Sequence, residues 1–188
     1  MILSDKQIKK LITEQEMISP FEETINTGIS YGVSSYGFDA KLSNKMFFFD
    51  KELNEHLILD PKNIKEKDGF FHVLESNDFF IVPPYSFALG KTKEYFKIPS
   101  DVLALCIGKS TYARCGLILN VTPLEPGWEG FVTLEFSNST PFPIKLYVDE
   151  GVCQFVFFQG DEQCEVTYKD KLGKYMHQVD ITLPKNKL

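Results

Sequence analysis

Short hydrophobic segments separated by proline and glycine make up most of this sequence from Tyr31 onward. Proline fixes the backbone angle φ and removes a hydrogen-bond donor, and glycine supplies the conformations that tight turns need. The 17 Phe and 8 Tyr residues favour strands, because aromatic side chains suit a pleated, half-buried surface. We therefore expect a mainly β fold, an antiparallel sandwich or barrel with few short helices.

The segments that we expect to form strands begin near residue 38. Phe38, Ala40 and Leu42 alternate with Asp39 and Lys41, as along a strand. The other predicted strands are Met46–Phe49, Phe70–Leu74, Phe79–Val82, Ser86–Thr92, Tyr95–Ile98, Val102–Ile107, Leu117–Val121, Phe131–Phe136, Ile144–Val148, Val152–Phe158 and Glu165–Tyr168.

One short amphipathic helix is predicted at the N-terminus. Ser4 can cap it, and Gln7 follows three residues later, as in a capping box. Ile8, Leu11 and Ile12 fall on one face of this helix. We interpret it as structural.

The length of 188 residues predicts a single domain spanning residues 1–188, with a lysine-rich C-terminal tail or lid at about 169–188. The net charge of −6 disfavours a nucleic-acid-binding protein, which needs a broad basic face. No apolar run is long enough to span a membrane, and the first residues lack a signal-peptide pattern. We expect a cytoplasmic protein.

The residues that most often bind zinc are scattered along the chain. A zinc site needs clustered Cys, His or carboxylate ligands, and no C-x-x-C spacing is present. We therefore expect no zinc site and no disulfides. The residues in question are Cys106, Cys115, Cys153, Cys164, His56, His72 and His177.

The segment from Gly108 to Gly116 is a candidate anion site. It is long enough for about two turns of helix, and we expect Ser110 to be the N-cap. A short helix start leaves backbone N–H groups free, which suits a phosphate. Lys109 and Arg114 add positive charge, and Arg114 is the only arginine in the chain. The alternative interpretation is a capped turn that connects two strands.

A rigid loop and a strand follow. Asn120–Gly130 contains two prolines, two glycines and the only tryptophan, Trp128, which either lines a binding site or pins the turn from the core. In the strand Phe131–Phe136, Glu135 stands among apolar residues. Such a carboxylate either faces solvent or is held partly desolvated, where its raised pKa would let it move protons near neutral pH.

Together these segments resemble one known family, the dCTP deaminases. The resemblance covers nearly the whole chain in order. The stretches that carry it are Gly108–Arg114, Asn120–Thr122, Glu125–Gly130, Thr133–Asn138, Ser34–Asp39, Glu150–Gln154 and Lys174–Pro184.

The resemblance implies a fold and a reaction. The fold is the distorted, β-rich barrel or sandwich of the dUTPase type, assembled as a homotrimer with active sites shared between subunits. The reaction is hydrolysis of dCTP to dUTP and ammonia without zinc, which supplies dUMP for thymidylate synthesis. Mg2+ would accompany the substrate, held mainly by phosphate oxygens and water rather than by protein ligands.

The resemblance also assigns roles to residues. Glu135 would move protons between water and the leaving amine, Ser110 and the Pro123 carbonyl would orient the water, and Arg114 would stabilise charge at the reacting centre. The catalytic residues are thus Glu135, Ser110 and Arg114. The predicted substrate-binding residues are Lys109, Ser110, Thr111, Tyr112, Ala113, Arg114, Pro123, Glu125, Thr133, Leu134, Glu135, Gln154, Tyr168, Lys174 and Gln178.

The tail departs from the family pattern. Related sequences carry glycine around Gln178, whereas this chain has His177 and Asp180. A carboxylate near a triphosphate would need Mg2+ or Lys174 to offset its charge.

Other activities remain open at this point. The chain could also cleave dUTP to dUMP and pyrophosphate, as some relatives with nearly these motifs do. A pure dUTPase is disfavoured, because no glycine-rich C-terminal arm is visible. A non-catalytic nucleotide-binding regulator would not need the carboxylate of Glu135.

Overall fold

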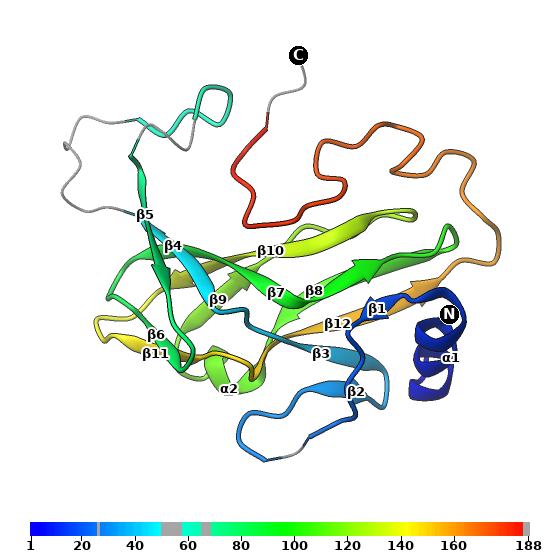
Figure 1. Ribbon diagram of the computed structural model, residues 1–188, viewed down its shortest axis with the longest axis horizontal. Coiled ribbons are helices and arrows are strands. Elements are labelled where there is room, and N and C mark those ends of the chain that lie inside the picture. The colour runs from blue at the N-terminus through cyan, green and yellow to red at the C-terminus, as the bar shows by residue number, and fades with distance from the viewer. Residues whose placement is uncertain (26, 50–57, 65–68, 186–188) are drawn as a thin grey trace.

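A computed structural model describes residues 1–25, 27–49, 58–64 and 69–185. These residues form an N-terminal helix, α1 (Asp5–Gln15), a short second helix, α2 (Ser110–Ala113), and antiparallel sheets (Figure 1). The capping box at Ser4 and Gln7 is present, and Ile8 and Ile12 are buried, so the predicted helix is confirmed.

The largest sheet carries the strand that holds Glu135. Its strands run in the order β5 (Phe71–Glu75), β4 (Lys45–Phe49), β7 (Phe87–Lys97), β10 (Glu129–Asn138) and β9 (Leu117–Asn120), and β1 (Ile18–Ser19) also pairs with β7. The second sheet has the order β2 (Gly32–Ser34), β3 (Gly37–Lys41), β12 (Gly151–Gln159) and β8 (Val102–Gly108). The third pairs β6 (Phe79–Val82) with β11 (Ile144–Tyr147).

The two larger sheets pack on each other through phenylalanine. The ring of Phe96 in β7 lies 4.4 Å from that of Phe155 in β12 and 6.3 Å from that of Phe38 in β3, measured between centroids. All three side chains are almost fully buried. This aromatic layer confirms the predicted sandwich-like packing. In the described part of the chain the sheets stay open and form no closed barrel.

Most predicted strands are confirmed, with two corrections. The segments Ser86–Thr92 and Tyr95–Ile98 are one long strand, β7. The polar residues between them belong to a bulge, where two extra residues of β7 interrupt the pairing with β10. The predicted strand Glu165–Tyr168 is wrong, because this segment forms bends and turns at the start of the tail.

The bulge is filled by buried polar groups. The hydroxyl of Thr92 accepts a hydrogen bond from the backbone N–H of Val132 at 3.0 Å, which replaces the missing strand pairing. Glu94 is buried and accepts from the backbone N–H of Lys41 at 3.0 Å. The Lys41 ammonium lies 2.6 Å from the carboxylate of Glu22. The alternating pattern of β3 therefore does not produce an exposed face, because both of its faces are covered.

Candidate active site

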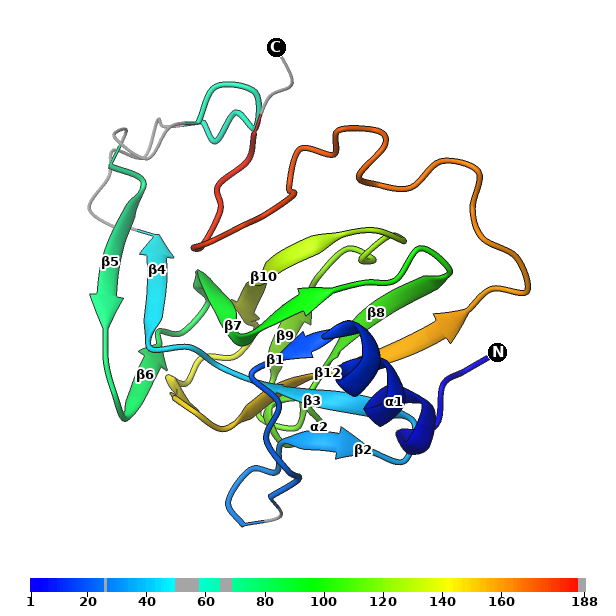
Figure 2. The same cartoon turned by 45° about the vertical axis from the view of Figure 1, so that its right-hand side comes forward.

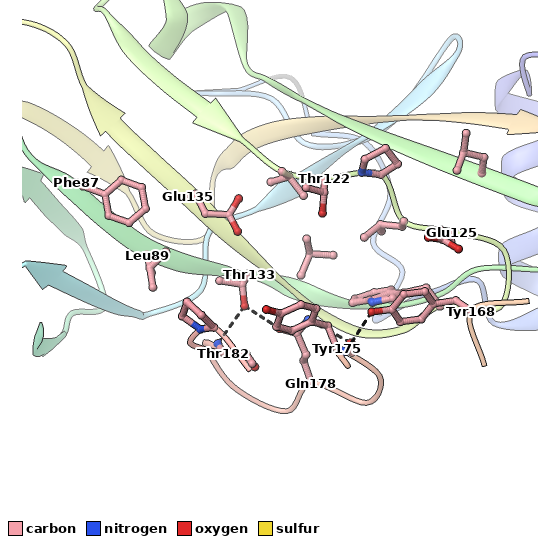
Figure 3. Close-up of a pocket in the computed structure, with 17 residues that line it drawn as sticks. Phe87, Leu89, Thr122, Glu125, Thr133, Glu135, Tyr168, Tyr175, Gln178 and Thr182 are labelled. Atoms are coloured by element: carbon pink, nitrogen blue, oxygen red, sulfur yellow. Dashed lines mark hydrogen bonds between the residues drawn. The ribbon is translucent and has the colours of Figure 1, made fainter. Parts of the chain in front are cut away.

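A cavity of about 730 Å³ lies between β10, the loop after β9 and the C-terminal tail (Figure 3). The side chains around it are mostly apolar or aromatic, with a few polar groups, as is typical of ligand pockets. The cavity is lined by Phe87, Leu89, Leu103, Val121, Thr122, Pro123, Leu124, Glu125, Trp128, Val132, Thr133, Glu135, Tyr168, Tyr175, Gln178, Thr182 and Pro184.

Glu135 brings an ionisable group into this cavity from β10 (Figure 3). Its neighbours Leu134 and Phe136 point to the opposite face and are fully buried, because side chains alternate along a strand. One carboxyl oxygen, Oε2, is buried and has no hydrogen-bond partner within the described part of the chain. Loss of solvent raises the pKa of this carboxyl to about 7, against a hydrogen bond from its own backbone that lowers it.

The C-terminal tail closes one side of the cavity. The backbone N–H groups of His177 and Phe131 form a ladder with the carbonyls of Glu129 and Gln178, at 2.7 and 2.9 Å. Gly130 makes this approach possible, since a Cβ at this position would lie 2.8 Å from the backbone nitrogen of Gln178. The tail is thus held along the edge of β10.

Thr133 connects the tail to the strand of Glu135. Its hydroxyl donates to the side-chain oxygen of Gln178 at 2.8 Å and accepts from the backbone N–H of Thr182 at 3.1 Å (Figure 3). Nearer the start of the tail, the hydroxyl of Tyr168 accepts a hydrogen bond from the backbone N–H of Tyr175 at 3.2 Å. These contacts hold two tail residues and two tyrosine rings at the cavity wall.

Six of the residues predicted from the resemblance meet in this cavity. They are Pro123, Glu125, Thr133, Glu135, Tyr168 and Gln178. Glu125 accepts a hydrogen bond from Lys171 of the tail at 3.1 Å. Trp128 is buried, as expected of a residue that pins the turn from the core, and its side chain also forms part of the cavity wall. Leu134 contributes no side chain to the cavity, because that side chain lies in the core.

The other predicted residues form a second group around α2. Ser110, Thr111, Ala113 and Arg114 are exposed. Ser110 is the first residue of the helix and Lys109 is its N-cap, so the predicted cap at Ser110 is wrong by one position.

Tyr112 and Lys109 anchor this second group of residues to the neighbouring strands and loops. The side chain of Tyr112 is buried, and its hydroxyl accepts from the backbone N–H of Tyr147 at 3.1 Å. Lys109 forms an ion pair with Asp39 and donates to the hydroxyl of Ser30 at 3.1 Å. Gln154 lies opposite Asp39 in the neighbouring strand.

A single chain does not bring the two groups together. None of residues 109–114 lines the cavity. In two views α2 lies on the far side of the strands from the C-terminal tail (Figures 1 and 2). Lys174, in the tail, is exposed and also lies outside the cavity lining.

Some cavity residues carry no role in the sequence prediction. Tyr175 and Thr182 belong to a stretch that supports the resemblance, but only the folding of the tail places them at the wall. Phe87 and Leu89 come from β7, and nothing in their sequence context distinguishes them from other strand residues. Asp180 is paired with Lys45 and Lys91 rather than with Lys174, the cation that the sequence analysis named to offset its charge.

The described residues contain no group of three or more His, Cys, Asp or Glu side chains placed to hold a metal ion. His56 lies outside the described residues. In the same part of the chain, no helix has both the length and the apolar character needed to cross a membrane.

Comparisons with known proteins identify the family of this chain. The family model described as dCTP deaminase-like matches residues 2–160. The chain is 54% identical over 190 residues to a dCTP deaminase of Rickettsia akari, covering 97% of this chain and 98% of that protein. It is 53% identical over 189 residues to a dCTP deaminase of Rickettsia bellii, with the same coverage of both proteins.

A solved structure has a similar fold. The crystal structure of 2'-deoxycytidine 5'-triphosphate deaminase from Agrobacterium tumefaciens aligns with a TM-score of 0.64 at 19% sequence identity. The alignment covers 85% of this chain and 48% of that one, so this chain spans about half the length of that protein.

The raised pKa of Glu135 predicts a pH-dependent cost to stability. The buried carboxyl holds its proton up to about pH 7, whereas its ordinary value is 4.5. The protonated carboxyl therefore makes a favourable contribution to the free energy of unfolding, which is fully present below the unfolded-state pKa. This contribution is lost as the pH rises through about 7. Glu135→Gln, which stays neutral, should be more stable than the parent by up to about 3 kcal/mol at pH 8. The difference should nearly vanish at about pH 4.5.

Urea unfolding of both proteins at the two pH values measures this difference. Glu162→Gln is the matched control, because Glu162 is exposed. A stability difference for Glu135→Gln that does not change with pH would contradict the burial of this carboxyl.

Proposed function

Because the chain belongs to the dCTP deaminase-like family, it is an enzyme that deaminates dCTP, and we propose that Glu135 moves the protons in this reaction. One observation carries the proposal. Glu135 holds a buried carboxyl oxygen that has no hydrogen-bond partner among the described residues, and its pKa is raised to about 7 at the wall of a cavity of about 730 Å³.

The chemistry needs a group that both accepts and donates a proton. Water attacks C4 of the cytosine ring, and one of its protons must leave as the new C–O bond forms. The amino group must then gain a proton before the C–N bond breaks and ammonia departs. A carboxyl with a pKa near 7 can do both at neutral pH, because its two protonation states have similar free energies.

The cavity residues suggest how the substrate lies. Backbone groups of Thr133 and Leu134, next to Glu135, would hydrogen-bond the edge of the base. Glu125 would contact the sugar once it leaves Lys171. Tyr168, Lys174 and the amide of Gln178 would face the triphosphate beneath the tail, which acts as a lid.

The remaining catalytic groups would come from a second copy of the chain. Ser110 would orient the water together with the Pro123 carbonyl, and Arg114 would stabilise charge at the reacting centre. The exposure of α2 and its separation from the cavity support this arrangement. Lys109, Thr111, Tyr112, Ala113 and Gln154 would complete the nucleotide site from that copy. A homotrimer would form three such sites by symmetry.

The substrate would be dCTP with Mg2+ on its phosphates. The ion would neutralise part of the triphosphate charge and be held largely by phosphate oxygens and water. We propose a reaction that needs no zinc, carried out in the cytoplasm, with dUTP feeding the supply of dUMP.

Product analysis tests the function. Purified protein incubated with dCTP and Mg2+ should release dUTP and ammonia, unaffected by a zinc-selective chelator. Glu135→Gln should bind dCTP but lose about a thousandfold or more of the turnover. Unchanged dCTP from the folded, assembled parent protein would contradict the catalytic role and favour a nucleotide-binding regulator.

The same assay separates the second candidate activity. Accumulation of dUMP and pyrophosphate from dCTP would show that the enzyme also cleaves dUTP. Pyrophosphate is absent if deamination is the only reaction.

Mixing two inactive variants tests whether the site is shared. Glu135→Gln and Arg114→Gln should each be inactive alone. After joint unfolding and refolding at equal amounts, about one quarter of the sites should combine an intact Glu135 with an intact Arg114 from the neighbouring copy. Recovery of about that fraction of parent activity supports the shared site. A mixture as inactive as its components would show that each site is built within one chain.

A further inference from the structure

Asp180 in the tail makes an ion pair with each of two strands of the large sheet. Its carboxylate lies 2.5 Å from the ammonium of Lys45 in β4 and 3.4 Å from that of Lys91 in β7. Lys91 also donates to the backbone carbonyl of the adjacent residue, Val179, at 3.1 Å. The two lysine side chains are 25% and 18% exposed and Asp180 is 42% exposed, so the contacts are partly shielded from solvent.

The two lysines are held in place by other groups as well. The ammonium of Lys45 lies 5.4 Å from the ring centroid of Phe47, and that of Lys91 lies 4.9 Å from that of Phe131. Rings below a lysine favour a defined position of its charge. Little ordering of the lysines is therefore required when Asp180 binds between them.

The charge of Asp180 is maintained in this position. Partial burial opposes ionisation, but the hydrogen bond from Lys45, that from the backbone of Ile181 and the charge of Lys91 outweigh it. The net result is a pKa below the usual range for aspartate. The contacts are therefore ion pairs at neutral pH.

Asp180 lies between the two tail residues that contact Thr133. Gln178 precedes it and accepts from the Thr133 hydroxyl, and Thr182 follows it and donates to the same oxygen. Next to Asp180, Ile181 is buried in a small apolar cluster with Phe47 and Leu89. The ion pairs thus stand at the centre of the segment that closes the cavity.

We propose that Asp180 is a positioning residue for nucleotide binding, which acts as a charged latch on Lys45 and Lys91. The latch holds the tail against β10 and so keeps Gln178 at the cavity wall. Its effect on substrate rests on the proposed function, whereas its effect on the tail does not. It also gives a role to the carboxylate that a triphosphate site would otherwise disfavour.

The test replaces Asp180 with asparagine, which keeps the shape and removes the charge. We expect faster hydrogen exchange at the amides of His177 and Thr182 in the nucleotide-free protein. We also expect KM for dCTP to rise about two- to fivefold, the range of a partly exposed ion pair, with kcat little changed. The rise should shrink at about 1 M salt, where such pairs are screened. Asp180→Glu should recover most of the loss.

The matched control is Asp149→Asn. Asp149 forms a similar ion pair with Lys93, at 2.6 Å, and lies outside the cavity lining. Asparagine tolerates the positive φ of 60° at this position. This variant should leave KM and the exchange of the tail amides unchanged.

Two results would overturn the latch. Unchanged exchange of the tail amides in Asp180→Asn would show that the ion pairs do not hold the tail. An equal rise of KM in Asp149→Asn would show a general effect of net charge. If the parent protein does not deaminate dCTP, the kinetic test fails with the proposed function, and the exchange measurement still decides whether the latch exists.

Discussion

The pairing of β7 with β10 is the interaction on which the rest of the structure depends. This ladder brings Glu135 beside Leu89 and places Thr133 where the tail can bind it. Through Phe96, the same β7 strand packs against the second sheet. The bulge in β7 interrupts the ladder next to the cavity, and the Thr92 hydroxyl keeps β10 hydrogen-bonded there. One pair of strands therefore joins the core, the cavity and the tail.

An acidic chain repels a triphosphate substrate unless positive side chains are concentrated at the binding site. With a net charge of −6, local cations must be placed where the phosphates bind. Lys45 and Lys91 lie near the cavity, yet they bind the tail through Asp180. Arg114 is exposed at the C-terminal end of α2, away from the cavity of its own chain. Under the proposed function, assembly of several copies supplies the missing charge to each site.

Local pattern in the sequence predicted the β class, the capping box at Ser4 and most of the strands, because short apolar runs between prolines and glycines permit little else. The bulge was missed, since the polar residues at its centre resemble a turn until the burial of Glu94 is known. The resemblance supplied Glu135 and Gln178, which meet in the cavity. The contacts of Asp180 with Lys45 and Lys91 join residues far apart in the chain, and no local pattern reports such pairs.

The pH dependence of kcat/KM tests the central claim, that the desolvated carboxyl of Glu135 moves the protons. This parameter reports the ionisation of essential groups in the free enzyme. It should be measured with enough Mg2+ to keep the triphosphate complexed. The account predicts a rise in kcat/KM with a midpoint near the Glu135 pKa of about 7. A profile that stays flat from about pH 5.5 to 8 would contradict it, because an ordinary carboxylate is already ionised throughout that range.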